Sequence, residues 1–262
     1  PEAYGGYALA ITVINLLNAL CFHSVRMSLI RHYEAEEDPG RLLGTIFVWF
    51  HGFLALVVIV YAALETWWPG VSEQRTLWRI GLAYLWMLAW FELSLNLYRA
   101  RLAPLKYGAL FLAKHGLAMA FSCAAVMLGW GASGLMAGMV TGTALAMAIP
   151  TFTQWRGIRL RKVSLPLLGR LLRYGLPLTV TFTTGYLVHG AGRMMLGWLD
   201  SVEAAGLYAV AYDITQQSIL MLMTVVNLAA FPIVLRKLER EGEAAAREQL
   251  ARNAGLLLTI TV

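Results

Sequence analysis

The sequence predicts an all-α protein that crosses a membrane several times. Three observations support this fold class: 59% of the 262 residues are hydrophobic, only 14% are charged, and the hydrophobic residues gather in long runs. Soluble domains are about 45–50% apolar and about 25% charged, so this excess is more than one compact core needs. The composition therefore argues against a soluble enzyme, a nucleic-acid-binding module or a disordered scaffold.

Seven apolar runs reach the length of about 20 residues that a helix needs to cross the hydrocarbon layer. They are much longer than the roughly ten-residue alternating strands of a membrane β-barrel. An eighth run begins near Leu250, and the chain starts with Pro1 and not with Met. From these two features we expect the chain to be a segment of a longer protein. The seven complete runs cover residues 6–28, 42–65, 77–98, 107–129, 131–153, 174–198 and 206–235.

Basic residues are distributed unevenly between the connections. The connections after the first, third, fifth and seventh runs hold 17 of the 21 Lys and Arg residues, whereas the opposite set holds only Arg75 and Arg79. Because Lys and Arg accumulate on the cytoplasmic side, this asymmetry predicts the orientation and supports the number of spans. Tryptophans that lie near predicted helix ends, where the indole favours the membrane interface, are Trp67, Trp68, Trp78, Trp130, Trp155 and Trp198.

Two short segments of the chain resemble each other. Residues 1–11 (PEAYGGYALAI) and 202–212 (VEAAGLYAVAY) match at six of eleven positions, and each precedes a run that leads inward. Six spans between them give both copies the same orientation, as in transporters built from two repeated halves. Chance recurrence of small residues at helix starts is the alternative. We expect a first lobe over 1–153, a basic cytoplasmic linker over 154–173 and the start of a second lobe over 174–262.

Ionisable residues inside the apolar runs are candidate functional residues, because a charge in the bilayer is costly and usually faces a cavity or a partner. Arg193 is the first candidate, with His189 one turn earlier on the same helical face. The alternative for Arg193 is a side chain that reaches out to the interface. Lys114 ranks second as a phosphate or sugar contact and can also snorkel.

A polar cluster in the seventh run consists of Asp213, Gln216 and Gln217. It could bind sugar hydroxyls, couple to a proton or sodium ion, or place Asp213 against Arg193. Cys21 and Cys123 lie inside apolar runs, so neither a disulfide framework nor a metal site is supported. We expect no cofactor.

Further polar residues lie in the first and third runs. Arg26 and Arg31 close the first run on its cytoplasmic side, as phosphate ligands or as ordinary positive-inside anchors. His23 is either a packing residue or a proton carrier. Glu92 and Arg99 share one helical face, and we expect them to form a polar seam. A stripe of small residues that lets helices approach closely consists of Gly134, Gly138 and Gly142.

Five segments of the chain carry a resemblance to a known family: PEAYGGYALA at 1–10, RLAPLKYGALFLAK at 101–114, RLLRYGLPL at 170–178, GRMMLGWLDSVEAAGLYAVAYDI at 192–214, and the FP pair at 231–232. They resemble the polysaccharide exporters, which are lipid-linked oligosaccharide flippases of the O-antigen type within the multidrug/oligosaccharidyl-lipid/polysaccharide superfamily. One position departs from the family pattern: members usually carry an acidic residue before the arginine of the seventh helix, where this chain has Gly192 before Arg193.

The resemblance implies two lobes of six helices around a central cavity, with this chain running from the family's second helix into its ninth. It implies alternating access that carries an undecaprenyl-pyrophosphate-linked oligosaccharide across the bacterial inner membrane, without catalysis. The implied partners are that lipid-linked oligosaccharide, membrane lipids, a glycan polymerase and other pathway proteins, and no nucleic acid. The alternatives are a drug/cation antiporter of the same superfamily and a membrane-embedded glycan polymerase or ligase.

Overall fold

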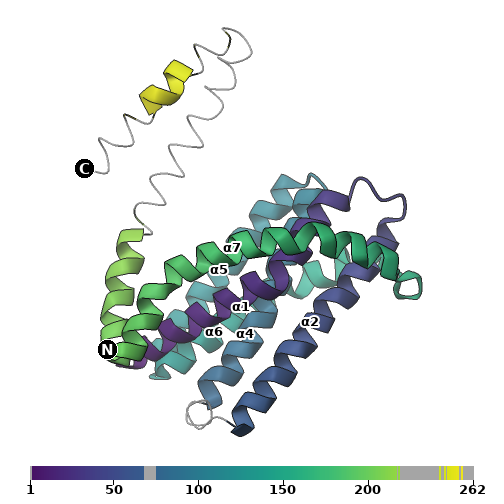
Figure 1. Ribbon diagram of the computed structural model, residues 1–262. Coiled ribbons are helices and arrows are strands. Elements are labelled where there is room, and N and C mark those ends of the chain that lie inside the picture. Colours follow the sequence, from purple (N-terminus) through teal and green to yellow (C-terminus); the bar gives the residue numbers. More distant parts are fainter. Residues whose placement is uncertain are drawn as a thin grey trace. The chain divides into compact units, whose positions relative to one another are not determined.

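A computed structural model shows a helical chain (Figure 1). It describes residues 2–67, 75–216, 218, 242, 245, 247–253 and 255, and these contain no strand, in agreement with the predicted all-α class. The chain divides into two compact units, Pro1–Gly206 and Leu207–Val262. The predicted lobes and linker, with boundaries at residues 153 and 173, stay predictions.

Five helices are long and apolar enough to cross a membrane, and they coincide with the first five predicted spans. The chain is therefore a multi-pass membrane protein. The helices are α1 (Glu2–His32), α2 (Pro39–Trp67), α4 (Arg75–Ala100), α5 (Pro104–Met127) and α6 (Gly131–Gln154), followed by a 3-10 turn η1 (Leu160–Lys162) and α7 (Leu165–Leu199).

The sixth predicted span lies inside α7, which is not one of the five apolar helices. Its threonines and glycines, together with His189, interrupt the apolar residues, so α7 lacks a stretch as long and apolar as those of the five helices. Residues 202–216 are helical and begin the seventh predicted span, but the rest of that span and most of the eighth lie outside the described residues.

Helix α4 is the most buried of the five membrane-crossing helices, because it packs against α1, α5 and α6. Large apolar side chains from several helices meet around it, and burying each contributes roughly 1.5–3 kcal/mol. The fully buried side chains of this core include Phe22, Leu29, Leu43, Ile46, Phe50, Leu85, Leu93, Leu97 and Met136.

The cytoplasmic end of α6 is fixed to α4 by a tryptophan pair. Trp155 stacks on Trp90 with 4.6 Å between ring centroids, and its Nε1 donates to Ser94 Oγ at 3.3 Å. Trp155 therefore lies at the end of α6, as predicted, but its indole is buried and finds its hydrogen-bond partner within the bundle. Trp67 and Trp130, in contrast, are exposed near helix ends, as predicted.

The predicted stripe of small residues is confirmed as a packing surface between α5 and α6. A Cβ atom added at Gly138 would collide with the backbone of Ser122, and one at Gly142 with the backbone of Ala118. Because the obstructing atoms are backbone, no side-chain rotation relieves either collision.

We expect Gly142→Ala to destabilise the protein by about 1–3 kcal/mol, because the added methyl group forces α5 and α6 apart. Thermal unfolding in detergent measures the change. Gly116→Ala on α5 is the control, since a Cβ atom there meets nothing within 4 Å. Equal unfolding temperatures for the two variants would contradict close packing at Gly142.

Candidate functional site

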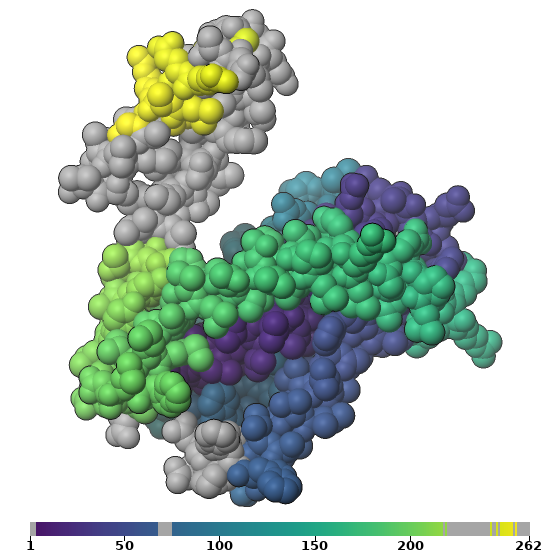
Figure 2. All heavy atoms as spheres, in the orientation of Figure 1, coloured from purple at the N-terminus to yellow at the C-terminus, as the bar shows by residue number. Residues whose placement is uncertain are grey.

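The face of α7 that packs on α1 is small and polar over much of its length. Figure 2 shows α7, in green, lying along α1, in purple. We call this contact the α1–α7 seam. The buried residues of α7 recur mostly at every fourth position and so form one stripe: Leu167, Leu171, Gly175, Thr179, Thr183 and Gly190.

The backbones of the two helices approach closely at the cytoplasmic end of the seam. Ser28 Oγ donates to the carbonyl oxygen of Leu171 at 2.8 Å. A Cβ atom at Gly175 would stand 2.6 Å from the carbonyl oxygen of Ser24, so only glycine allows this approach. Small and polar groups of the two helices therefore meet here, next to the buried Leu167 and Leu171.

Several buried polar atoms along the seam lack hydrogen-bond partners among the described residues. They include His23 Nε2, Ser24 Oγ and Thr183 Oγ1. The His23 ring also packs on that of Phe182 of α7, with 3.9 Å between centroids. Because buried polar groups are normally hydrogen-bonded, such atoms are suited to bind water or a polar ligand once the helices move apart.

A buried arginine lies beside His23. The Arg26 side chain is only 7% exposed, and it forms an ion pair with Glu92 of α4. Arg26 Nη1 donates to Asn18 Oδ1 at 3.3 Å, Asn18 Nδ2 donates to Glu92 Oε2 at 2.8 Å, and Arg26 Nη2 lies 3.4 Å from His23 Nδ1. We call these four residues the Arg26 cluster. Its ion pair and hydrogen bonds offset the cost of removing a guanidinium from water.

Two predictions about this region are wrong. Arg26 does not close its helix: α1 continues to His32, about 9 Å farther, because no glycine or proline interrupts residues 27–32. Glu92 pairs with Arg26 and not with Arg99. The neighbouring helix brings Arg26 directly to the carboxylate, whereas Arg99 lies two turns away along α4 and is exposed.

The other basic candidates of α1 and α7 differ in burial. Arg31 is exposed at the cytoplasmic end of α1, His189 is exposed on α7, and Arg193 is half-buried. Gly190, next to His189, packs so closely on α1 that a Cβ atom would lie 2.8 Å from Thr12 Cγ2. This part of α7 therefore continues the seam, and the binding roles of Arg31, His189 and Arg193 stay predictions.

Lys114 lies away from the seam. Its side chain is buried, and Nζ stands 5.3 Å from the centroid of the Phe91 ring on α4. Among the described helices, α5 contacts only α4 and α6. The structure thus gives Lys114 a cation–π contact inside the bundle and does not bring it to the Arg26 cluster.

The polar cluster of the seventh predicted span belongs to the second compact unit. Asp213 is exposed and Gln216 is half-buried, while Gln217 lies outside the described residues. A pair between Asp213 and Arg193 would join the two units, and it stays a prediction.

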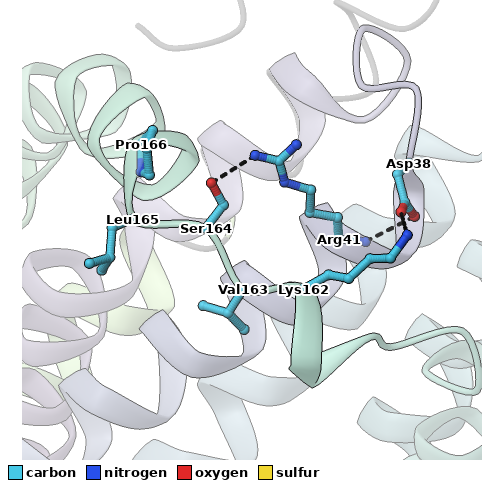
Figure 3. Close-up of a pocket in the computed structure, with 7 residues that line it drawn as sticks. All are labelled: Asp38, Arg41, Lys162, Val163, Ser164, Leu165 and Pro166. Carbon is cyan, nitrogen blue, oxygen red and sulfur yellow. Dashed lines mark hydrogen bonds and ion pairs between the residues drawn. The ribbon is translucent and has the colours of Figure 1, made fainter.

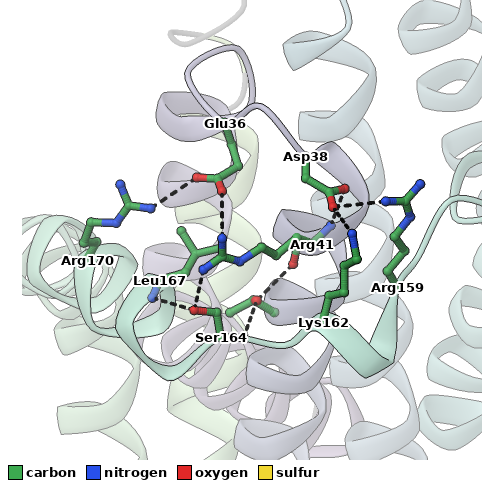
Figure 4. A network of polar contacts seen from close by, with 9 residues as sticks. Glu36, Asp38, Arg41, Arg159, Lys162, Ser164, Leu167 and Arg170 are labelled. Carbon is green, nitrogen blue, oxygen red and sulfur yellow. Dashed lines mark hydrogen bonds and ion pairs between the residues drawn. The ribbon is translucent and has the colours of Figure 1, made fainter.

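A second polar group occupies the end of the bundle predicted to be cytoplasmic (Figure 4). Asp38 Oδ2 accepts from Arg159 Nη1 and from Lys162 Nζ, each at 3.1 Å. Glu36 pairs with Arg170 of α7 at 3.2 Å and lies 3.9 Å from Arg41. These contacts, which we call the cytoplasmic network, tie the α1–α2 loop to the linker between α6 and α7.

An open pocket lies within the cytoplasmic network (Figure 3). Arg41 Nη2 donates to Ser164 Oγ at 2.7 Å, and Ser164 caps α7 by accepting from the Leu167 amide at 3.4 Å. The network has four basic side chains and two carboxylates, so it carries two surplus positive charges that favour an anion here. The basic residues are Arg41, Arg159, Lys162 and Arg170, and the acidic residues are Glu36 and Asp38. The residues that line the pocket are Asp38, Arg41, Lys162, Val163, Ser164, Leu165 and Pro166.

The family of the chain follows from comparison with known proteins. A family model described as polysaccharide biosynthesis protein matches residues 1–253. The chain belongs to this polysaccharide biosynthesis protein family. The match confirms the resemblance to polysaccharide exporters and indicates a role in polysaccharide synthesis or export. The comparisons with curated proteins and with solved structures found no match.

The sequence interpretation missed the cytoplasmic network of this polysaccharide biosynthesis protein. A signal was present, because acidic residues at 34–38 and basic residues at 156–173 both fall on the predicted cytoplasmic side. Opposite charges on one membrane face attract, but the pairing depends on which loop reaches which helix end.

We expect Arg26→Gln to lower the free energy of unfolding by about 3 kcal/mol, because it leaves the Glu92 carboxylate without its counter-charge. The double variant Arg26→Gln/Glu92→Gln removes both charges and should recover much of this loss. Denaturant unfolding in detergent measures both. Arg31→Gln is the control and should change stability by less than about 0.5 kcal/mol, because Arg31 is exposed. A double variant that is less stable than Arg26→Gln would contradict the pairing.

The ammonium of Lys162, which donates to Asp38, lowers the pKa of that carboxyl below its ordinary value of 3.8, and the Arg41 amide and the Arg159 charge act in the same direction. A lowered pKa means that the stabilisation is complete above the ordinary value and is lost as the pH falls through the folded-state pKa. We therefore expect Asp38→Asn to be less stable than the wild type at pH 7. The two unfolding temperatures should converge as the pH falls through the folded-state pKa of Asp38, below its ordinary value of 3.8. A gap that does not change with pH would contradict this role.

Proposed function

We propose that this protein is a flippase that moves an undecaprenyl-pyrophosphate-linked oligosaccharide across the bacterial inner membrane by alternating access, and that it catalyses no reaction. The observation that carries the proposal is a buried arginine beside a polar helix–helix seam, inside membrane-spanning helices of a polysaccharide biosynthesis protein. A charge within a membrane segment usually marks a substrate path.

The chemistry of the cargo fits the Arg26 cluster. A diphosphate must lose hydration as it enters a membrane protein, and a guanidinium can bind its oxygens in bidentate fashion. Glu92, whose side chain is 31% exposed, neutralises Arg26 when no substrate is bound. In our proposal a diphosphate oxygen takes the place of that carboxylate, so Arg26 stays paired in both states.

The cytoplasmic network supports the loading step. Its two surplus positive charges attract an anionic head group at the face where lipid-linked sugars are assembled. Its ion pairs are solvent-exposed and individually weak, worth about 0–1 kcal/mol each, so they can open. Movement of α7 relative to the α1–α2 loop would then expose the seam.

The same residues favour a flippase over the two alternatives. A drug/cation antiporter needs acidic groups free to bind a cation, but Arg26 already neutralises Glu92. A glycan polymerase or ligase needs room for an active site outside the membrane, and the connections between the five apolar helices are short.

We expect Arg26→Gln/Glu92→Gln to reduce flipping of a polyprenyl-diphosphate-linked oligosaccharide at least about tenfold, because the fixed cation is gone. The readout is the loss of glycan accessibility to an impermeant reagent in proteoliposomes containing the full-length protein. Arg193→Gln tests the second cation in the same assay. Lys106→Gln, an exposed cytoplasmic charge outside both polar groups, is the control. Wild-type flipping by the double variant would overturn the role of Arg26, and elongation of the glycan would favour a polymerase.

A further inference from the structure

An apolar groove lies between α1, α2 and α4, the three helices labelled in Figure 1, and its wall contains none of the four residues of the Arg26 cluster. It exists because only the cytoplasmic half of α2 is buried: apart from Val57, the buried residues of α2 all lie at or before Phe50. The outer half of α2 packs less closely and leaves about 390 Å³ beside α1 and α4. The wall consists of Val13, Ile14, Leu17, Cys21, Leu56, Val57, Val60, Tyr61, Leu64, Trp78, Gly81, Leu82 and Leu85.

A charged group lies at the outer end of this groove. Arg79 Nη2 donates to Glu65 Oε1 at 2.7 Å, and Arg75 Nε lies 3.7 Å from the same oxygen. Glu65 follows the wall residue Leu64, and Arg79 follows the wall residue Trp78. Both arginine side chains are more than half exposed, at 57% and 63%, so their remaining N–H groups are accessible.

These two arginines are the exceptions to the charge asymmetry of the chain. Arg75 and Arg79 are the two basic residues in the predicted outer connections, against 17 on the cytoplasmic side, and both lie at this groove. One arginine would suffice to neutralise Glu65. The three residues together carry a net charge of +1 beside an apolar channel in the outer half of the bundle.

We propose that the groove and these arginines form a binding site for one anionic phospholipid of the outer leaflet. An acyl chain fills the groove, and the phosphodiester lies on Arg75 and Arg79. The net charge of +1 matches the single negative charge of a phosphodiester, and arginine binds phosphate oxygens in bidentate fashion. Trp78 lies where an indole favours the head-group level. The site is independent of the proposed flippase function.

The test is native mass spectrometry of the full chain in detergent, titrated with phosphatidylglycerol and with phosphatidylcholine of the same acyl chains. We expect phosphatidylglycerol to bind more tightly, and Arg75→Gln/Arg79→Gln to weaken its binding at least about fivefold while leaving phosphatidylcholine unchanged. Glu65→Gln should tighten phosphatidylglycerol binding, because it removes the competing carboxylate. That gain cannot come from a damaged fold.

Two bulky substitutions on α2 test the groove itself. Val60→Trp fills it and should abolish binding of both lipids, whereas Val58→Trp, at an exposed α2 position that is not part of the wall, should not. Arg99→Gln/Lys106→Gln removes two exposed cytoplasmic charges and should leave binding unchanged. Equal affinity for the two lipids, no effect of Glu65→Gln and Val60→Trp, or tighter binding of polyprenyl phosphate than of phosphatidylglycerol would overturn the proposal.

Discussion

The structure depends on the cost of placing an arginine inside a membrane-spanning bundle. Arg26 cannot lie against lipid, so it is paired with Glu92 and hydrogen-bonded by Asn18. Because α1 and α4 supply these partners, the cluster determines how the two helices face each other. It also leaves His23, on the same helix, directed at α7. A buried charge of the bundle therefore lies next to the α1–α7 seam.

Our proposal requires the α1–α7 seam and the cytoplasmic network to separate. Beyond Leu167 and Leu171, the α7 side of the seam consists of glycine and threonine, and several buried polar atoms along it lack hydrogen-bond partners within the described part of the chain. The network consists of exposed ion pairs, which stabilise weakly. The contact between α5 and α6 packs glycine against backbone at Gly138 and Gly142, as the seam does at Gly175. The seam differs because it also holds buried polar atoms that lack hydrogen-bond partners among the described residues.

Charge is distributed differently at the two membrane faces. The side predicted to be cytoplasmic combines many basic residues with a few carboxylates that bind loops to helix ends, as Asp38 and Glu36 do. The outer side carries little charge, and Arg75 and Arg79 accompany the groove left by α2. Each predicted face therefore carries a group with surplus positive charge. One group lies at an open polar pocket, and the other lies beside an apolar groove.

The sequence by itself determined the class and the five apolar spans, because span length is local and acts one helix at a time, whereas the orientation stays a prediction from basic-residue placement. It also identified the glycine stripe of α6, since a four-residue spacing repeats on one helical face. Only the tertiary structure decided that Arg26 meets Glu92, that Trp155 is buried and that Lys114 lies over Phe91. Each of these depends on which neighbouring helix supplies a partner, and side-chain spacing along one helix carries no information about its neighbours.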